Sequence, residues 1–132
     1  MYTLNEQPFI PHELEIILYA GMVVLEIMKQ SPDGLQEVQI ETIEAAEEGS
    51  SELFEQLSQL GLDAETTTRT LLLSHPEPEV LRYILDVVMD VELYDEEDPP
   101  IREEYRALAF FHLKVLLDAL IASRKPPTIT VH

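Results

Sequence analysis

The amino-acid sequence predicts an all-α fold, a single-domain bundle of five or six helices with an extended arm at each end (residues 1–11 and 126–132). The first observation is the stretch Ala107–Ile121, in which twelve of fifteen residues are apolar and do not alternate with polar ones. Such a run is too long and too uniform for a half-exposed strand, and it fits a helix. The second is the length of 132 residues, which suits one domain with a core of its own.

Ala107–Ile121 is predicted to be the centre of the bundle or half of a subunit interface, because a helix that is apolar around most of its circumference is buried on more than one side. Lys114 and Asp118 lie one turn apart in it, and we expect them to form an ion pair. His112 lies on nearly the opposite side, where we expect a core histidine bonded to a group such as Tyr105. The candidate residues for a contact with a second copy are Phe110, Phe111, Leu117 and Ile121.

The first helix is expected from Pro11 to about Gln30, after an arm whose Phe9 and Ile10 reach the core. Pro11 suits the first helical turn, because its missing N–H has no intrahelical partner there. Gly21 lowers helix propensity, so we expect a close crossing with another helix at this position. We expect the helix to be buried over most of its girth and to expose one narrow sector, formed by His12, Glu15, Tyr19, Met22, Glu26 and Lys29.

The next part of the chain is expected to form two helices separated by a break. A turn at Ser31–Gly34 leads into Leu35–Glu48, for which a helix is favoured and a short strand remains open. Gly49–Ser51 is predicted to interrupt the chain, with Ser51 capping a further helix at Glu52–Leu60.

Residues 64–74 are expected to form another helix, although their threonines also permit a strand. Gly61 is a suitable residue to end the preceding helix in a left-handed conformation, and Asp63 is a suitable N-cap for this one. Both features favour a helix–turn–helix arrangement here.

The last two expected helices follow the proline-containing joint His75–Pro78. One runs to about Tyr94 and is ended by the acidic loop Asp95–Pro100, and the other starts near Ile101 and stops before the prolines at 126 and 127. We expect the tail to be disordered, although Thr128–Val131 alternates in a way that would let it pair with a strand edge.

Charge is the strongest global feature of the sequence. The chain has 26 acidic and 8 basic side chains, a formal net charge of −18, and no Lys or Arg between Gln30 and Thr68. Such a surface repels nucleic-acid phosphates and anionic lipids, so we expect neither nucleic acid nor a membrane as a partner. It attracts a basic protein or serves solubility alone. The candidate contact residues for a basic protein are Glu41, Glu44 and Glu48.

The residue types that are absent, and the spacing of those present, argue against several further kinds of site and location. Cysteine is absent, which excludes disulfides and thiolate chemistry. No signal peptide is expected, and the longest uncharged run in the first half, Ile16–Leu25, is about half a membrane span, so we expect a cytoplasmic protein. No Glu-x-x-His motif occurs and no two histidines are four residues apart, so we expect no metal and no cofactor.

Two short motifs point towards enzymes. Glu92–Asp95 resembles the Glu-x-x-Asp motif of the MazG family, all-helical nucleotide pyrophosphohydrolases that hold magnesium with carboxylates. Their second motif, Glu-Glu-x-x-Glu, is not matched, because Glu47–Glu52 has one residue too many and contains a glycine. Arg106 and His112 have the spacing of HEPN-type ribonucleases, but they fall on different sides of one helix in an acidic chain.

The sequence therefore favours a non-enzymatic protein-interaction or assembly protein, a homo-oligomer with an acidic face for a basic partner. The alternatives are a magnesium- or manganese-dependent nucleotide phosphohydrolase and an acidic mimic of nucleic acid. No catalytic, cofactor-binding or metal-binding residue is assigned from the sequence.

Overall fold

The computed structural model describes residues 8–30 and 34–124, and in these the fold is all-α, as predicted. The helices are α1 (Pro11–Lys29), α2 (Ile40–Leu60), α3 (Ala64–Ser74), α4 (Pro78–Met89), the 3₁₀ helix η1 (Val91–Leu93) and α5 (Glu103–Ala122). Residues 1–7, 31–33 and 125–132 lie outside the described part, and with them most of both predicted arms, most of the predicted turn at 31–34 and the alternating segment 128–131.

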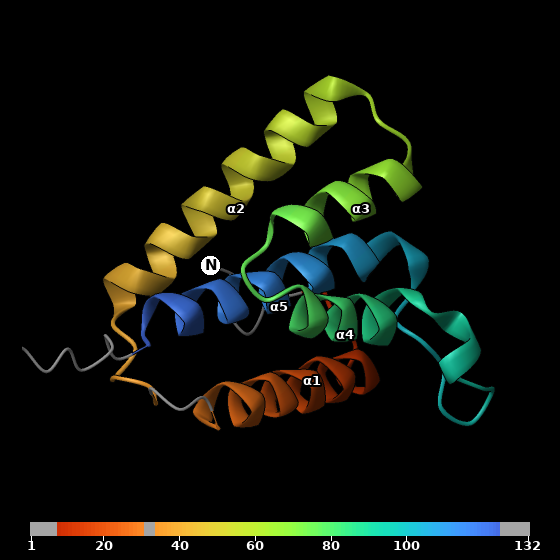
Figure 1. Cartoon of the computed structure of the whole chain (residues 1–132). Coiled ribbons are helices and arrows are strands. Elements are labelled where there is room, and N and C mark those ends of the chain that lie inside the picture. Colours follow the sequence, from red (N-terminus) through yellow and green to blue (C-terminus); the bar gives the residue numbers. More distant parts are fainter. Residues whose placement is uncertain (1–7, 31–33, 125–132) are drawn as a thin grey trace, which may run out of the picture.

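Helix α5 is the centre of the bundle, which confirms the prediction from Ala107–Ile121. Helices α1, α2 and α4 each pack against it, and α3 packs on α4. Figure 1 shows α1 on one side of α5 and α2 on the other. Because α5 is covered from three directions, eight of its residues are buried: Ala109, Phe110, Leu113, Lys114, Val115, Leu117, Ala119 and Leu120.

The predicted break at Gly49–Ser51 is wrong, because α2 is one unbroken helix of 21 residues. A glycine inside a helix costs only about 1 kcal/mol relative to alanine. Ser50 is buried, with 1% of its surface exposed, and it hydrogen bonds to side chains of α5 instead of ending a helix. Tertiary contacts thus override the local preference for a turn, and Ser51 caps nothing.

The segment before α2 is neither the predicted helix nor a strand of a sheet. Leu35 forms an isolated antiparallel bridge with Arg124, and the backbone N–H of Gln36 donates to the carbonyl of Ser123 at 2.7 Å. This pairing holds the start of the segment beside the end of α5, and α2 begins only at Ile40.

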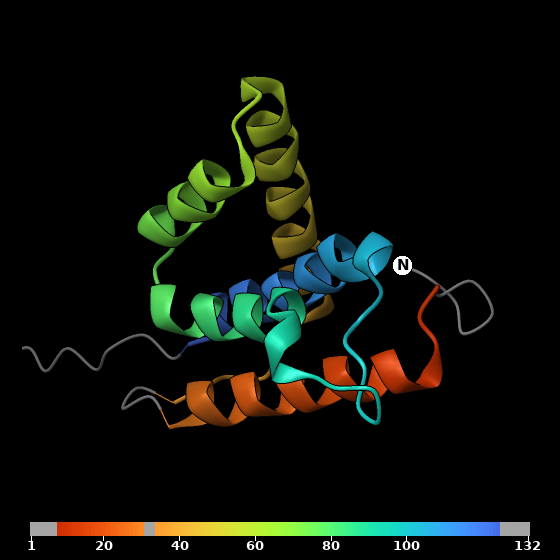
Figure 2. The same ribbon diagram turned by 90° about the vertical axis from the view of Figure 1, so that its right-hand side faces the viewer.

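The predicted C-terminal end of α2 and the predicted N-terminal cap of α3 are confirmed. Gly61 closes α2 with a φ of 66°, in the left-handed region that favours glycine. The side chain of Asp63 accepts a hydrogen bond of 2.7 Å from the backbone N–H of Thr66 and caps α3. Figure 2 shows that α2 and α3 meet at this turn and spread apart from it, so the tip of this hairpin stands away from the other helices.

Helix α4 ends at Met89, five residues before the predicted end at Tyr94. Asp90 leaves the helical conformation with a ψ of 96°, and its side chain accepts a hydrogen bond from the backbone N–H of Glu92 to start η1. The Tyr94 hydroxyl then donates to the carbonyl of Val87 at 2.7 Å and folds the chain back onto α4.

Helix α1 crosses α5 where the sequence predicted, but its exposed face is wider than predicted. Phe9 is buried, with 7% exposed, and Gly21 lies against Leu113 and Leu116 of α5, which confirms the expected close crossing. The exposed face of α1 is wider than predicted, because Leu18 is 65% exposed. The helices of the described part leave this side open, since α2 packs mainly on α5.

Candidate functional site

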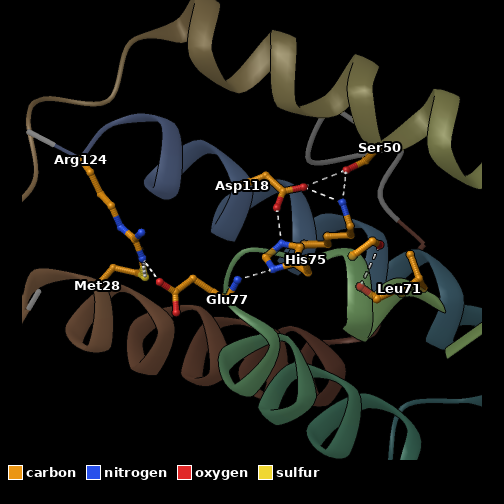
Figure 3. Close-up of polar contacts among 9 residues, drawn as sticks. Met28, Ser50, Leu71, His75, Glu77, Asp118 and Arg124 are labelled. Carbon is orange, nitrogen blue, oxygen red and sulfur yellow. Dashed lines mark hydrogen bonds and ion pairs between the residues drawn. The ribbon is translucent and has the colours of Figure 1, made fainter. Parts of the chain in front are cut away.

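A cluster of polar side chains joins three parts of the chain at the centre of the fold. Lys114 Nζ donates to Asp118 Oδ2 at 2.6 Å, which confirms the predicted pair, and to Ser50 Oγ at 3.1 Å. Ser50 Oγ in turn donates to Asp118 Oδ2 at 3.3 Å (Figure 3). The pair was predicted from its spacing, but that spacing gave no sign that the Lys114 side chain is only 6% exposed.

His75, in the joint between α3 and α4, completes this cluster. Its Nε2 donates to Asp118 Oδ1 at 2.7 Å, and its Nδ1 accepts from the backbone N–H of Glu77 at 3.0 Å (Figure 3). The acceptor role of Nδ1 places a ring proton on Nε2. Burial raises the pKa of Asp118, but the hydrogen bonds from His75 and Lys114 outweigh burial and bring the pKa below its ordinary value.

The cluster holds α2, α5 and the α3–α4 joint together, and it lacks the features of a catalytic centre. A serine next to a lysine is a known nucleophile–base pair, but the lysine must be neutral to accept a proton. Lys114 Nζ is already bonded to Asp118 Oδ2 and Ser50 Oγ, and Ser50 is 1% exposed and out of reach of a substrate. A small cleft of about 360 Å³ lies over the cluster, and Ile121 lines it.

A second pair of charges joins the first turn of α1 to the residue that precedes α5. The carboxylate of Glu13, 1% exposed, accepts hydrogen bonds from Arg102 Nη2 at 2.8 Å and Nε at 2.9 Å. These bonds are the main cause that lowers the pKa of Glu13 to about 2. The guanidinium also lies 4.4 Å from the ring centre of Tyr105. Nothing in the sequence distinguishes this glutamate from its neighbours, so the pair was not predicted.

An apolar cleft of about 840 Å³ lies between α1, α2 and α5. Its floor is formed by α5, with Val115 and Ala119 at its centre, and α1 and α2 form its walls. These two helices both pack on α5 and diverge from each other (Figure 1). We call this hollow the α5 cleft; its lining includes Phe9, Leu14, Ile17, Leu25, Val38, Ile43, Glu47, Ser51, Leu108, Phe111, His112, Val115, Leu116, Ala119 and Leu120.

His112 lines the α5 cleft. Burial lowers its pKa, partly offset by the nearby carboxylate of Glu47, so the ring is neutral at pH 7. Its ring lies edge-on to those of Phe9 and Phe111, at 6.3 and 5.8 Å between centres. An aromatic and apolar environment of this kind fits the prediction of a core histidine, and the bond to Tyr105 stays a prediction.

The four apolar residues predicted for a contact with a second copy lie in different environments. Phe110 and Leu117 are 4% and 0% exposed and pack inside the chain's own core, where a partner has no access to them. Phe111 lines the α5 cleft and Ile121 the small cleft, and both are half-buried. The sequence could not separate the two pairs, because this helix is apolar around most of its circumference.

The exposed face of α2 carries the predicted acidic residues. Glu41, Glu44 and Glu48 are all exposed, and because the helix is unbroken the same face continues through Glu52 and Glu55. At 100° per residue these five lie within roughly 80° of the helix circumference, opposite the buried residues Ser50 and Leu57. We call this row the acidic stripe.

A second surface feature lies on α1. Leu18, Tyr19 and Met22 are each about two-thirds exposed, at 65%, 68% and 67%. They are neighbours on one side of the helix, and clusters of exposed large apolar residues mark contact sites more often than isolated ones do. Only Tyr19 and Met22 fell within the sector that the sequence predicted to be exposed.

The residues of the two enzyme motifs do not form sites of the expected kind. Glu92 belongs to the short helix η1 and Asp95 follows it, where its side chain accepts hydrogen bonds from the backbone N–H groups of Glu97 and Asp98. The carboxylates of the motif therefore do not share the face of an α-helix. Arg106 donates to the carbonyl of Ile101 at 2.8 Å and so braces the start of α5.

Within residues 8–30 and 34–124, no group of three or more His, Asp or Glu side chains is placed to hold a metal ion. In the same residues no helix is both long and apolar enough to cross a membrane. Comparison of the chain with protein-family models, with curated proteins and with solved structures finds no match.

Proposed function

We propose that this chain is a helical protein-interaction protein that binds a basic partner through the acidic stripe of α2. The observation that carries the proposal is that α2 holds six glutamates and no Lys or Arg, and that none of the six forms an ion pair within the described residues. The stripe is roughly 21 Å long from Glu41 to Glu55 at 1.5 Å per residue.

The arrangement of these charges supports a contact role. Like charges three or four residues apart destabilise a helix by about 0.2–0.5 kcal/mol per pair. A basic surface laid along the stripe would relieve this repulsion and would also be steered towards it by the field of the protein. The side of α2 that packs on the bundle has no such repulsion between charges, because its residues are apolar apart from Ser50.

We propose further that copies of the chain associate through α1, where Leu18, Tyr19 and Met22 are exposed. Leu18 and Met22 also line a hollow of about 320 Å³ together with Leu113 of α5, so the apolar surface of α1 continues to the edge of α5. Two copies related by a twofold axis would each cover the other's apolar residues.

The acidic stripe can be tested with charge-matched variants. The triple variant Glu41→Gln, Glu44→Gln, Glu48→Gln removes three charges from the stripe, and Glu79→Gln, Glu96→Gln, Glu103→Gln removes three exposed charges elsewhere. Affinity for a labelled oligolysine peptide is measured by fluorescence anisotropy at several salt concentrations. We expect the stripe variant to bind more weakly than the control and to show a shallower salt dependence. Equal losses in both would mean that net charge alone attracts the peptide, and would refute the proposal.

A further inference from the structure

We propose that the α5 cleft binds one amphipathic helix of the basic partner, with the apolar face of that helix in the cleft and its Lys or Arg side chains along α2. This inference rests on the proposed function, because it takes the partner to be basic. It adds a second contact, which is apolar and which the acidic stripe does not supply. It also assigns the mode of binding, a helix docked in a groove.

The floor of the cleft is a continuous row of residues along α5. Leu108, His112, Val115 and Ala119 follow one another along α5 at intervals of four, three and four residues, and all of them line the cleft. The row is roughly 17 Å long at 1.5 Å per residue, which corresponds to three turns of a docked helix. Helices that bind in grooves use apolar residues at i, i+3 or i+4, and i+7 over a similar length.

The depth of the cleft comes from small side chains at its centre and from diverging walls. Val115 and Ala119 are 8% and 1% exposed and leave room above the backbone of α5. Ile17 of α1 and Ile43 of α2 stand on opposite sides, and Ile43 is 37% exposed. An apolar hollow of about 840 Å³ therefore lies open to a partner between two apolar walls.

Charge identifies the occupant as basic. No Lys or Arg is among the lining residues, and the α2 wall carries the carboxylate of Glu47. Glu44 and Glu48 of the acidic stripe follow directly outside this wall on the same helix. A helix with cations along the edge that faces α2 would meet these carboxylates, whereas an acidic helix would be repelled.

The same charges argue against a second copy of this chain as the occupant. The cluster of exposed apolar residues that a second copy offers on one helix is on α1, where Tyr19 and Met22 are flanked by Glu15 and Glu26. Docking α1 of a second copy in the cleft would bring these two carboxylates towards Glu47.

The test uses synthetic peptides of about 14 residues, or roughly four turns. The first has leucines at helical spacing and lysines elsewhere, the second has the same composition in scrambled order, and the third replaces each lysine by glutamate. Binding of each labelled peptide to the full chain is measured by anisotropy at 0.15 M salt, and its helicity by circular dichroism. We expect the first peptide to bind at least about tenfold more tightly than the scrambled one and to become helical, and the glutamate peptide not to bind.

Variants of the cleft locate the binding. Ala119→Phe fills the floor and Ile43→Ser removes part of the exposed wall; Ile40→Ser is the matched control, since Ile40 is 69% exposed on the same helix and outside the cleft lining. We expect Ala119→Phe to lose about tenfold in affinity, Ile43→Ser several-fold and Ile40→Ser nothing. Because Ala119 is buried and its replacement can disturb folding, Ile43→Ser with its control decides the question if Ala119→Phe does not fold.

The possible failures are distinguishable. If the amphipathic and scrambled lysine peptides bind equally, and lose affinity in the triple glutamine variant at 41, 44 and 48, the cleft proposal is wrong and the acidic stripe stands. If Ala119→Phe or Ile43→Ser instead converts a dimer into a monomer in sedimentation equilibrium while Ile40→Ser does not, the occupant is a second copy and the proposal is overturned. Failure of the oligolysine test with retained binding in the cleft refutes the proposed function alone.

Discussion

The guanidinium of Arg102 forms two hydrogen bonds, of 2.8 and 2.9 Å, with the carboxylate of Glu13, 89 residues earlier in the chain. The pair ties the first turn of α1 to the residue that precedes α5, and the backbone N–H of Arg102 adds a third bond to the same carboxylate. Glu13, the one buried acidic side chain among the described residues, thus has both carboxylate oxygens hydrogen bonded at the point where two helices begin.

This pair predicts how stability depends on pH. The pKa of Glu13 falls from 4.5 to about 2 on folding, so its contribution of about 3 kcal/mol is present above pH 4.5 and is lost as the pH falls towards 2. We expect Glu13→Gln to lower the free energy of unfolding by about that amount at pH 7, and the difference from the wild type to shrink between pH 4.5 and 3. Urea unfolding at each pH measures this difference. Glu15→Gln, an exposed neighbour, is the control, and a difference for Glu13→Gln that stayed constant with pH would contradict the prediction.

The buried cluster around Lys114 predicts a large effect of small substitutions. Asp118→Asn leaves the ammonium of Lys114, 6% exposed, without its carboxylate, and we expect a loss of about 2–4 kcal/mol. Ser50→Ala removes a neutral partner and should cost about 1 kcal/mol. The double variant Lys114→Met, Asp118→Leu should be more stable than Asp118→Asn. Chemical unfolding of the three variants tests this order, and equal losses for all three would show that the charges are not coupled.

Two glycines are expected to respond to alanine in opposite directions. At Gly21 an added methyl group would meet Leu116 and Leu113 at 3.4 and 4.0 Å, which are ordinary contact distances. Gly21→Ala should therefore stabilise α1 by up to about 1 kcal/mol through helix propensity. Gly61→Ala should destabilise the chain by about 1–2 kcal/mol, because φ is 66° there. Thermal unfolding of both variants is the measurement, and a destabilising Gly21→Ala would mean that α1 and α5 cannot accommodate the methyl group.

The exposed side of α1 predicts a homodimer or a larger assembly. In sedimentation equilibrium at micromolar concentration we expect a mass above that of the 15.1 kDa chain. The double variant Tyr19→Lys, Met22→Glu replaces two exposed apolar residues by charged ones and leaves the net charge of the chain unchanged. We expect it to be a monomer, because the apolar contact is lost. Leu73→Ser, on an α3 residue that is 81% exposed, should leave the mass unchanged. A wild-type monomer would refute the association.

The unbroken α2 predicts that salt stabilises the fold. Glu41, Glu44, Glu48, Glu52 and Glu55 form four successive like-charge pairs at i,i+3 or i,i+4, whereas Glu37 lies before the helix and does not take part. The Debye length falls from about 30 Å at 0.01 M to about 8 Å at 0.15 M salt, which screens this repulsion. We expect the melting temperature to rise by a few degrees over this range, in line with about 1–2 kcal/mol. A fall would mean that attractive pairs such as Lys114–Asp118 outweigh the excess of acids.

The sequence was sufficient where local chemistry decides the structure. The central place of α5, the cap at Asp63 and the end at Gly61 all follow from a few neighbouring residues. It was insufficient where distant partners decide. Ser50 remains helical because its partners lie 64 and 68 residues away, and Glu13 is buried because of Arg102.

The candidate surfaces divide in the same way. The acidic stripe could be read from spacing alone, although its full length depended on the continuity of the helix through Gly49. The α5 cleft could not be predicted, because it arises from the angle at which α1 and α2 leave α5, and no short pattern encodes that angle. The burial of Phe110 and exposure of Leu18 follow from the same arrangement.

The tip of the hairpin formed by α2 and α3 should open locally more often than the rest of the fold. Residues 58–66, around its tip, are all exposed, while Leu57 and Leu71 are the hairpin's only residues below 10% exposure apart from Ser50. Opening of the tip would uncover almost no apolar surface, so its amide hydrogens should exchange with deuterium well before those of α5, in a motion that leaves the bundle intact. The end of α2 can thus adjust its direction over a partner's surface while the half that carries Glu41, Glu44 and Glu48 stays fixed by Ser50.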